Sequence, residues 1–161
     1  MVDVTMSKSK DVLDFYESLV DGLIEARAPH VLDFEGLGFS GIVTSKLISM
    51  ANKRVDIFHK NLAQAIWLNK DVSFSLSSAL RRGVSFNILA EEKFPKYIES
   101  VFSHYKVPVV YVECDIQAGN FIVSDDRAYA LFKPAGHSGF ACFNDGIISF
   151  KLSENVRAAC K

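Results

Sequence analysis

The residues with the clearest spacing for ligand chemistry are three glycines ahead of a predicted helix. Residues 36–41 read GLGFSG, a G-x-G-x-x-G pattern, and Asp56 follows at about the separation that ribose binding uses. In dinucleotide-binding units such glycines let the backbone approach a pyrophosphate at a helix N-terminus, and the acid binds a ribose hydroxyl. The pattern keeps a nucleotide-binding enzyme as one alternative, with its site at Gly36, Gly38, Gly41 and Asp56.

The segment before these glycines argues against that alternative. Residues 31–35 read VLDFE, so two carboxylates interrupt what should be a near-continuous apolar run in a central parallel strand. Glu35 would also lie beside the phosphates, and a long helix precedes the unit, whereas the fingerprint usually opens its domain. We therefore expect residues 36–41 to form a flexible surface loop, and we expect no cofactor.

Other catalytic patterns are weak. Residues 136–139 read GHSG, which differs from the G-x-S-x-G of a nucleophile elbow. Residues 104–106 read HYK and have a His-x-Lys spacing, but they end a predicted helix before Pro108, and no aspartate follows at the required distance. No metal-ligand spacing such as H-E-x-x-H occurs, and the cysteines form no C-x-x-C pair. The sequence therefore predicts no metal site.

Length and charge narrow the class of protein. The chain has 161 residues, 18 of them basic and 19 acidic, for a net charge of −1. This length suits one domain spanning residues 1–161, and the balanced charge gives no strong nucleic-acid signature. No segment approaches the ~18 apolar residues of a membrane span, and the N-terminus lacks the apolar core of a signal peptide. Widely spaced cysteines suit a reducing compartment, so we expect a cytoplasmic protein without a membrane segment.

Hydrophobic periodicity predicts the elements that would position these residues. An N-terminal helical extension is expected within residues 1–30, starting at a Ser9 cap and running to about Arg27. Further helices are expected over residues 42–51, 62–68, 72–82, 94–106 and 145–158. Strands are expected over residues 55–58, 84–89, 108–112, 121–123, 128–132 and 140–143, with a turn at Asp125-Asp126. Strands that alternate with helices, followed by a hairpin, predict an α/β fold with a mixed sheet.

Two segments resemble phospholipase D-like proteins. Residues 77–89, SSALRRGVSFNIL, resemble the helix, arginine-glycine-valine turn and strand of that family. Residues 120–126, NFIVSDD, resemble the strand that carries its catalytic motif, and residues 143–145, FND, lead into a last helix in the same order. The resemblance covers residues 42–157 and implies a mixed β-sheet flanked by α-helices, as in one half of a phospholipase D-like fold.

The family motif is incomplete in this chain. Family members use His-x-Lys followed after four residues by Asp: the histidine attacks phosphorus, the lysine neutralises phosphate oxygens, and the aspartate orients its partners. The matching positions here are Ala118, Asn120 and Asp125. Alanine is no nucleophile, and asparagine carries no charge. The resemblance therefore implies a catalytically inactive domain that serves as a binding, regulatory or assembly module, with a phosphodiesterase or nuclease of the family as the alternative.

Polar residues at predicted strand ends supply a candidate pocket. The resemblance nominates two of them, and polarity and strand position nominate the others. The set is His59, Asn61, Asn120, Asp125, Lys133 and His137. Its expected ligand is a phosphorylated small molecule or a protein partner. Half-size members of the family pair two identical chains, so the resemblance also implies a homodimer that brings Asn120 and Asp125 of both subunits to a shared groove.

Overall fold

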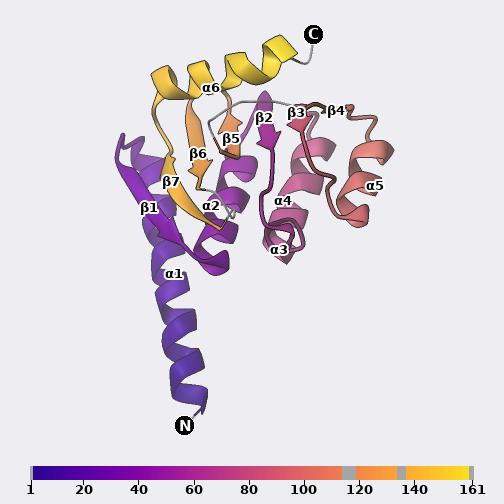
Figure 1. Cartoon of the computed structure of the whole chain (residues 1–161). Coiled ribbons are helices and arrows are strands. Elements are labelled where there is room, and N and C mark those ends of the chain that lie inside the picture. The colour runs from indigo at the N-terminus through magenta and orange to yellow at the C-terminus, as the bar shows by residue number, and fades with distance from the viewer. Residues whose placement is uncertain (1, 114–118, 134–136, 160–161) are drawn as a thin grey trace.

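The computed structural model describes residues 2–113, 119–133 and 137–159, which form a seven-stranded mixed sheet with helices on both faces (Figure 1). The strands are β1 (Val31–Glu35), β2 (Arg54–His59), β3 (Ser85–Ala90), β4 (Val109–Tyr111), β5 (Phe121–Ser124), β6 (Ala128–Phe132) and β7 (Ser138–Cys142). The helices are α1 (Val2–Ala26), α2 (Leu37–Met50), α3 (Gln64–Trp67), α4 (Lys70–Arg81), α5 (Lys96–His104) and α6 (Gly146–Ala159).

The sheet combines a parallel part and an antiparallel part. Its strand order is β1-β7-β6-β5-β2-β3-β4. Strands β2, β3 and β4 pair in parallel because helical crossovers connect them. Strands β5, β6 and β7 follow one another as antiparallel neighbours, and β5 pairs antiparallel with β2. The predicted mixed α/β sheet and the predicted hairpin at Asp125-Asp126 are both confirmed.

The prediction of a flexible loop at residues 36–41 is wrong. Residues 31–35 form the edge strand β1, which pairs antiparallel with β7, and α2 begins directly afterwards at Leu37. An edge strand can carry Asp33 and Glu35 because both side chains face solvent, whereas only Phe34 is buried. Gly36 precedes the helix with φ 97°, a left-handed conformation that glycine adopts without strain.

Each face of the sheet buries its own apolar cluster. On one face α2, α4 and α5 cover residues such as Ile57 and Ile88, which are fully buried. On the other face α6 covers Phe58 and Phe121 through Leu152. Burying a side chain of this size stabilises the fold by about 1.5–3 kcal/mol. Strand β4 is the second edge strand, and its side chains are only half-buried or exposed although all three are apolar or aromatic.

The N-terminal helix extends well beyond the body of the protein (Figure 1). It begins at Val2, so Ser9 lies inside the helix and not at its cap. Its packing partner is α2, where the Tyr16 ring meets the Phe39 ring edge-on at 4.8 Å and Val20 is fully buried. Lys46 of α2 forms ion pairs with Glu17 at 3.1 Å and Asp21 at 2.8 Å. Among the described helices, none is long and apolar enough to cross a membrane.

Candidate functional site

One end of the sheet gathers most of the polar residues that the sequence nominated. The strand register places the end of β2 beside the start of β5, the end of β6 and the start of β7. His59 and Asn61 therefore lie at the same end as Asn120, Lys133 and His137. Five of the six predicted pocket residues share this end because antiparallel neighbours bring one strand's start to the next strand's end.

Asn120 forms the centre of this end. Its side-chain Oδ1 accepts hydrogen bonds from the backbone N–H groups of Lys60 and Asn61, both at 2.7 Å. Its Nδ2 donates to Asn61 Oδ1 at 2.6 Å, and its own carbonyl accepts from Phe132 N–H at 2.8 Å. The residue is fully buried. Asn120 thus holds the chain after β2 against the start of β5 and the end of β6.

His59 is packed as a core residue at the end of β2. It is 1% exposed, and its ring stacks on Phe94 at 4.3 Å and meets Trp67 edge-on at 6.0 Å. Burial lowers the pKa of His59 to about 4, and the backbone of Lys93 offsets that effect only in part. No described side chain offers its ring nitrogens a hydrogen bond of ordinary geometry. A neutral imidazole enclosed in this way is out of reach of a substrate.

Lys133 and His137 lie on the exposed side of the same end. Lys133 places its ammonium group 5.1 Å from the centre of the Phe140 ring, a cation–π contact. It borders an open, polar hollow of about 390 Å³ whose walls include Asp33, Glu35 and Ser138. The His137 carbonyl accepts from Gly36 N–H at 2.9 Å, which ties β7 to the turn before α2. Lys133 and His137 therefore belong to the β1–β7 edge.

Asp125 does not join this group, which corrects the prediction. It follows the last residue of β5, so the whole strand separates it from Asn120. Its carboxylate accepts hydrogen bonds from three successive backbone N–H groups, those of Asn52, Lys53 and Arg54, at 2.8–2.9 Å. Asp125 therefore fixes the entry into β2. Since the two residues lie at opposite ends of the sheet, a single groove cannot contain both Asn120 and Asp125.

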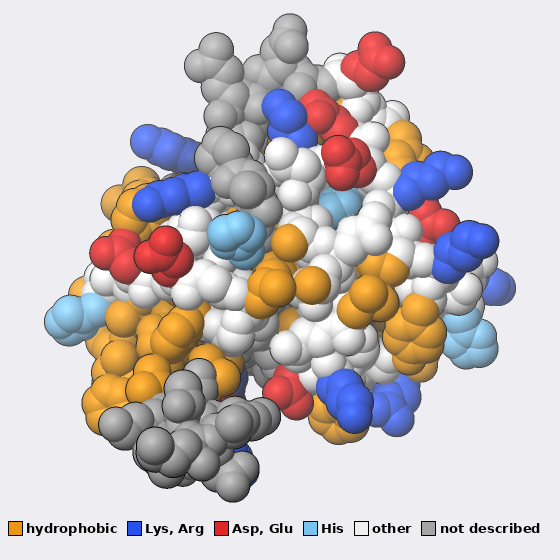
Figure 2. Space-filling view, turned by 60° about the horizontal axis from the view of Figure 1, so that its bottom comes forward, with side chains coloured by type: hydrophobic (Ala, Val, Ile, Leu, Met, Phe, Trp, Pro, Cys, Tyr) orange, Lys and Arg blue, Asp and Glu red, His pale blue; other side chains and the backbone are white. Residues whose placement is uncertain are grey.

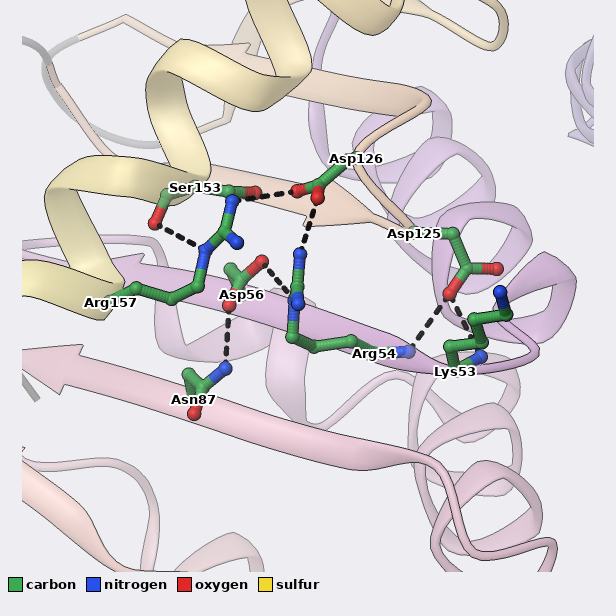
Figure 3. Close-up of polar contacts among 8 residues, drawn as sticks. All are labelled: Lys53, Arg54, Asp56, Asn87, Asp125, Asp126, Ser153 and Arg157. Carbon is green, nitrogen blue, oxygen red and sulfur yellow. Dashed lines mark hydrogen bonds and ion pairs between the residues drawn. The ribbon is translucent and has the colours of Figure 1, made fainter.

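A network of charged side chains that no sequence pattern indicated lies beneath α6 (Figure 3). Arg54 bridges two acids, with Nε 3.1 Å from Asp56 and Nη2 2.6 Å from Asp126. Arg157 of α6 reaches Asp126 at 3.2 Å, and Asn87 donates to the fully buried Asp56 at 2.8 Å. The network ties α6 to β2, β3 and the hairpin turn. Its members lie far apart in the sequence. The only local indication of the network was the opposite charge of Arg54 and Asp56, two residues apart.

Asp126 shows the electrostatic effect of this network. Burial by itself raises the pKa of this carboxyl. The hydrogen bond from Arg54, with the charges of Arg54 and Arg157, outweighs that effect and lowers the pKa below its usual 3.8. The Arg54 side chain is only 26% exposed and is paired with both Asp56 and Asp126. We conclude that this network is structural.

The glycines of residues 36–41 are explained by packing. A Cβ at Gly38 would approach Leu13 Cδ2 of α1 to 2.9 Å, and one at Gly41 would approach Asn69 Nδ2 to 2.8 Å. These two glycines let α1 and the cap of α4 lie close to α2. Asp56, the other residue of the nucleotide alternative, is enclosed beneath α6 by Arg54 and Asn87. Asp56, the residue that would bind ribose in that alternative, is thus already hydrogen-bonded to Arg54 and Asn87.

The remaining candidates can be placed briefly. Ala118, which matches the family histidine, lies outside the described residues. His104 ends α5, and Lys106 follows in a left-handed conformation with φ 57°, so this His-x-Lys spacing does not enter a strand. Within the described residues, no three His, Cys, Asp or Glu side chains are grouped as metal ligands would be.

Similar structures were found by fold, although no protein-family model and no curated protein matches the sequence. Nuc from Salmonella typhimurium, a phospholipase D family member, superposes with a TM-score of 0.55 at 14% identity, over 73% of this chain and 84% of Nuc. NucT from Helicobacter pylori gives 0.53 at 13% identity, over 81% and 93% of the two chains. TrmBL2, an archaeal chromatin protein with a novel mode of DNA binding, gives 0.58 at 15% identity, over 98% of this chain and 65% of TrmBL2.

Proposed function

We propose that this chain, which has a phospholipase D-like fold, is a catalytically inactive module that acts in binding, regulation or assembly. The observation that carries the proposal is the side chain of Asn120. At the position of the family lysine it presents no positive charge, and its amide is engaged with Lys60 and Asn61. Phosphoryl transfer requires a cation for the charge that develops on the phosphate oxygens. Asn120 supplies a structural tie instead.

The neighbouring histidine gives further support. A phosphodiesterase of this family needs an accessible imidazole that can attack phosphorus. His59 lies next to the Asn120 contacts along the chain, but its ring is enclosed by Phe94 and Trp67 and is only 1% exposed. We therefore do not expect His59 to replace the nucleophile that the methyl side chain of Ala118 lacks.

The test is hydrolysis of a chromogenic phosphodiester and of single-stranded DNA, with and without a chelator. We expect no turnover that follows the protein through a final size-exclusion column. The matched variant is Asn120→Ala, checked for folding by circular dichroism, which should leave the background rate unchanged because the Asn120 amide carries no charge and is engaged with Lys60 and Asn61. Chelator-resistant hydrolysis that tracks with the protein peak and falls in Asn120→Ala would favour the alternative, an active phosphodiesterase.

DNA binding is a second function to test, because TrmBL2 is described as a DNA-binding chromatin protein. The charge distribution disfavours it. The net charge is −1, and Figure 2 shows acidic and basic side chains interspersed over the face that it presents. Non-specific DNA binding depends on Lys and Arg groups that neutralise several phosphates. We expect no gel shift of duplex or single-stranded DNA at 150 mM salt, where the Debye length is about 8 Å.

We also propose that the chain forms a homodimer in solution. The support is the fold, since one phospholipase D-like unit carries one motif segment and a two-fold pair would bring two such segments together. We expect the end of the sheet around Asn120 to lie at the two-fold axis. Asp125 would not be part of this interface, because it lies at the other end of β5. Light scattering after size-exclusion chromatography over a dilution series tests this. A mass equal to one chain at every concentration would contradict it.

A further inference from the structure

The helix α1 carries an exposed apolar stripe outside its contact with α2. Val12, Phe15 and Leu19 are 52%, 73% and 41% exposed, and they recur at i, i+3 and i+7, so they form one row along the helix. Tyr16 and Val20 of the same helix supply the contact with α2. The apolar surface of α1 is thus wider than one neighbouring helix covers, and α2 accounts for only part of it.

The surface beside this stripe is acidic. Asp11, Asp14 and Glu25 are all exposed, and a helical wheel places the three on the same flank of the stripe. Residues 10–26 contain five acids and a single base, Lys10. Lys46 of α2 engages only the other two acids, which lie nearer the contact between the helices. The three flanking acids therefore give the exposed side of α1 an excess of negative charge.

This charge pattern disfavours a second copy of α1 as the partner. With the stripe as the seam, Asp11 and Glu25 occupy the same flanking position two heptads apart, and Asp14 lies on the same flank. An antiparallel pair of identical helices would set this acidic flank against the acidic flank of the partner, and a parallel pair would offer it no base. Like charges across a helix interface oppose association. An anionic membrane surface is disfavoured for the same reason.

We infer that the stripe on α1 binds a basic amphipathic helix of a partner protein. The partner would place apolar side chains at i, i+3 and i+7 against Phe15 and its neighbours, and Lys or Arg opposite the acidic flank. Opposite charges at the rim of an apolar contact raise the association rate and select the partner. The inference goes beyond the proposed function, because α1 lies outside the sheet end and an active enzyme could use the same stripe.

Fluorescence anisotropy with two labelled helical peptides of about 18 residues, roughly 27 Å of helix, tests the inference. Both peptides carry leucines at i, i+3 and i+7, and they differ only in having Lys or Glu at the flanking positions. We expect the intact chain to bind the Lys peptide at least tenfold more tightly than the Glu peptide, with an affinity that falls as salt is added. Equal binding of the two peptides, or no binding of the Lys peptide, would overturn the inference.

Substitutions in the stripe and its acidic flank test whether the peptide binds at this surface. Phe15→Ser with Leu19→Ser should weaken the Lys peptide at least tenfold, and Asp11→Lys with Asp14→Lys should reverse the preference between the peptides. Ile147→Ser is the matched control, because Ile147 is 74% exposed on α6, far along the chain from the stripe. Circular dichroism checks that each variant is folded. If Ile147→Ser weakened peptide binding as much as the stripe variant does, the basic helix would be refuted as the partner of the stripe. A dimer of the intact chain that dissociates only in the stripe variant would refute it as well, because a second copy would then cover the stripe.

Discussion

Asn120 and Asn61 are joined by two hydrogen bonds that run in opposite directions. The Asn61 N–H group donates to Asn120 Oδ1 at 2.7 Å, and Asn120 Nδ2 donates to Asn61 Oδ1 at 2.6 Å. The pair links the chain after β2 to the start of β5. A lysine at this position could not accept from Lys60 and Asn61. The asparagine at this position is thus coupled to the local backbone structure.

We expect Asn120→Ala to lower the free energy of unfolding by about 2 kcal/mol, because two partly buried N–H groups lose their acceptor. Asn61→Ala removes only one side-chain contact and should cost about 1 kcal/mol. Urea unfolding followed by tryptophan fluorescence measures both, since Trp67 is buried near this end. A loss in Asn61→Ala as large as that in Asn120→Ala would contradict the central role of the Asn120 oxygen.

Restoring the family residues should not create an efficient enzyme. The double variant Ala118→His with Asn120→Lys supplies an imidazole and an ammonium group, but it also removes the acceptor for Lys60 and Asn61 and buries a charge. A catalytic group acts only when surrounding residues hold its geometry. We expect a less stable protein with no hydrolysis of a chromogenic phosphodiester above the wild-type background. Robust turnover by a folded double variant would show that the surrounding site is still competent.

The buried histidine predicts a pH dependence of stability. The pKa of His59 is about 4 in the folded protein, against about 6.5 when unfolded, so the unfolded state binds the proton more readily. The free energy of unfolding should be unaffected by this group above pH 6.5 and fall by about 3 kcal/mol as the pH drops to 4. His59→Phe should remove that slope. Trp67→Phe alters a neighbouring ring but no titrating group, so it should lower stability and keep the slope. Urea unfolding at pH 4–8, followed by circular dichroism because Trp67 is the only tryptophan of the chain, checks both variants.

The two arginines beneath α6 should differ in their contribution to stability. Arg54→Met leaves the fully buried Asp56 with Asn87 alone, and an unpaired buried carboxylate costs about 3 kcal/mol. Arg157→Met leaves Asp126 paired with Arg54, so its cost should be about 1 kcal/mol or less. Adding Asp56→Asn to Arg54→Met should recover part of the loss. Equal costs for the two single variants in urea unfolding would contradict this ranking.

Periodicity predicted the central strands and most helices because their apolar residues are buried on the expected faces. It failed where an element lies at the edge of the sheet. No strand was expected over residues 31–35, because two acids interrupt the apolar run of a central parallel strand. These residues instead form the edge strand β1, whose Asp33 and Glu35 face water. The apolar run of residues 108–112 is typical of a buried strand, but β4 is the opposite edge of the sheet. The sequence pattern reveals how apolar a strand is, but not how many neighbours it has.

The candidate site was predictable only in part, for a related reason. Polarity at strand ends nominated both Asn61 and Asn120, and these two side chains are hydrogen-bonded to each other. It could not separate Asp125 from them, because that required knowing which end of β5 each residue occupies. The ion pair between Arg54 and Asp126 could not be predicted from the sequence either, because the two residues meet only through the pairing of β2 with β5.

Two glycines that sequence analysis cannot tell apart should respond differently to alanine. A Cβ at Gly139 would overlap the Leu131 carbonyl oxygen in the neighbouring strand β6, and backbone cannot move aside, so Gly139→Ala should cost about 3 kcal/mol. A Cβ at Gly38 would meet only the flexible end of Leu13 at 2.9 Å, and alanine is favoured over glycine in a helix by about 0.5–1 kcal/mol. Gly38→Ala should therefore change the free energy of unfolding by no more than about 0.5 kcal/mol. Urea unfolding measures both variants, and a thermal-shift screen with NAD and FAD should give the same response for Gly38→Ala as for the unmodified chain. A ligand-induced shift that disappears in Gly38→Ala would instead favour the nucleotide alternative, because a structural glycine has no reason to affect ligand binding.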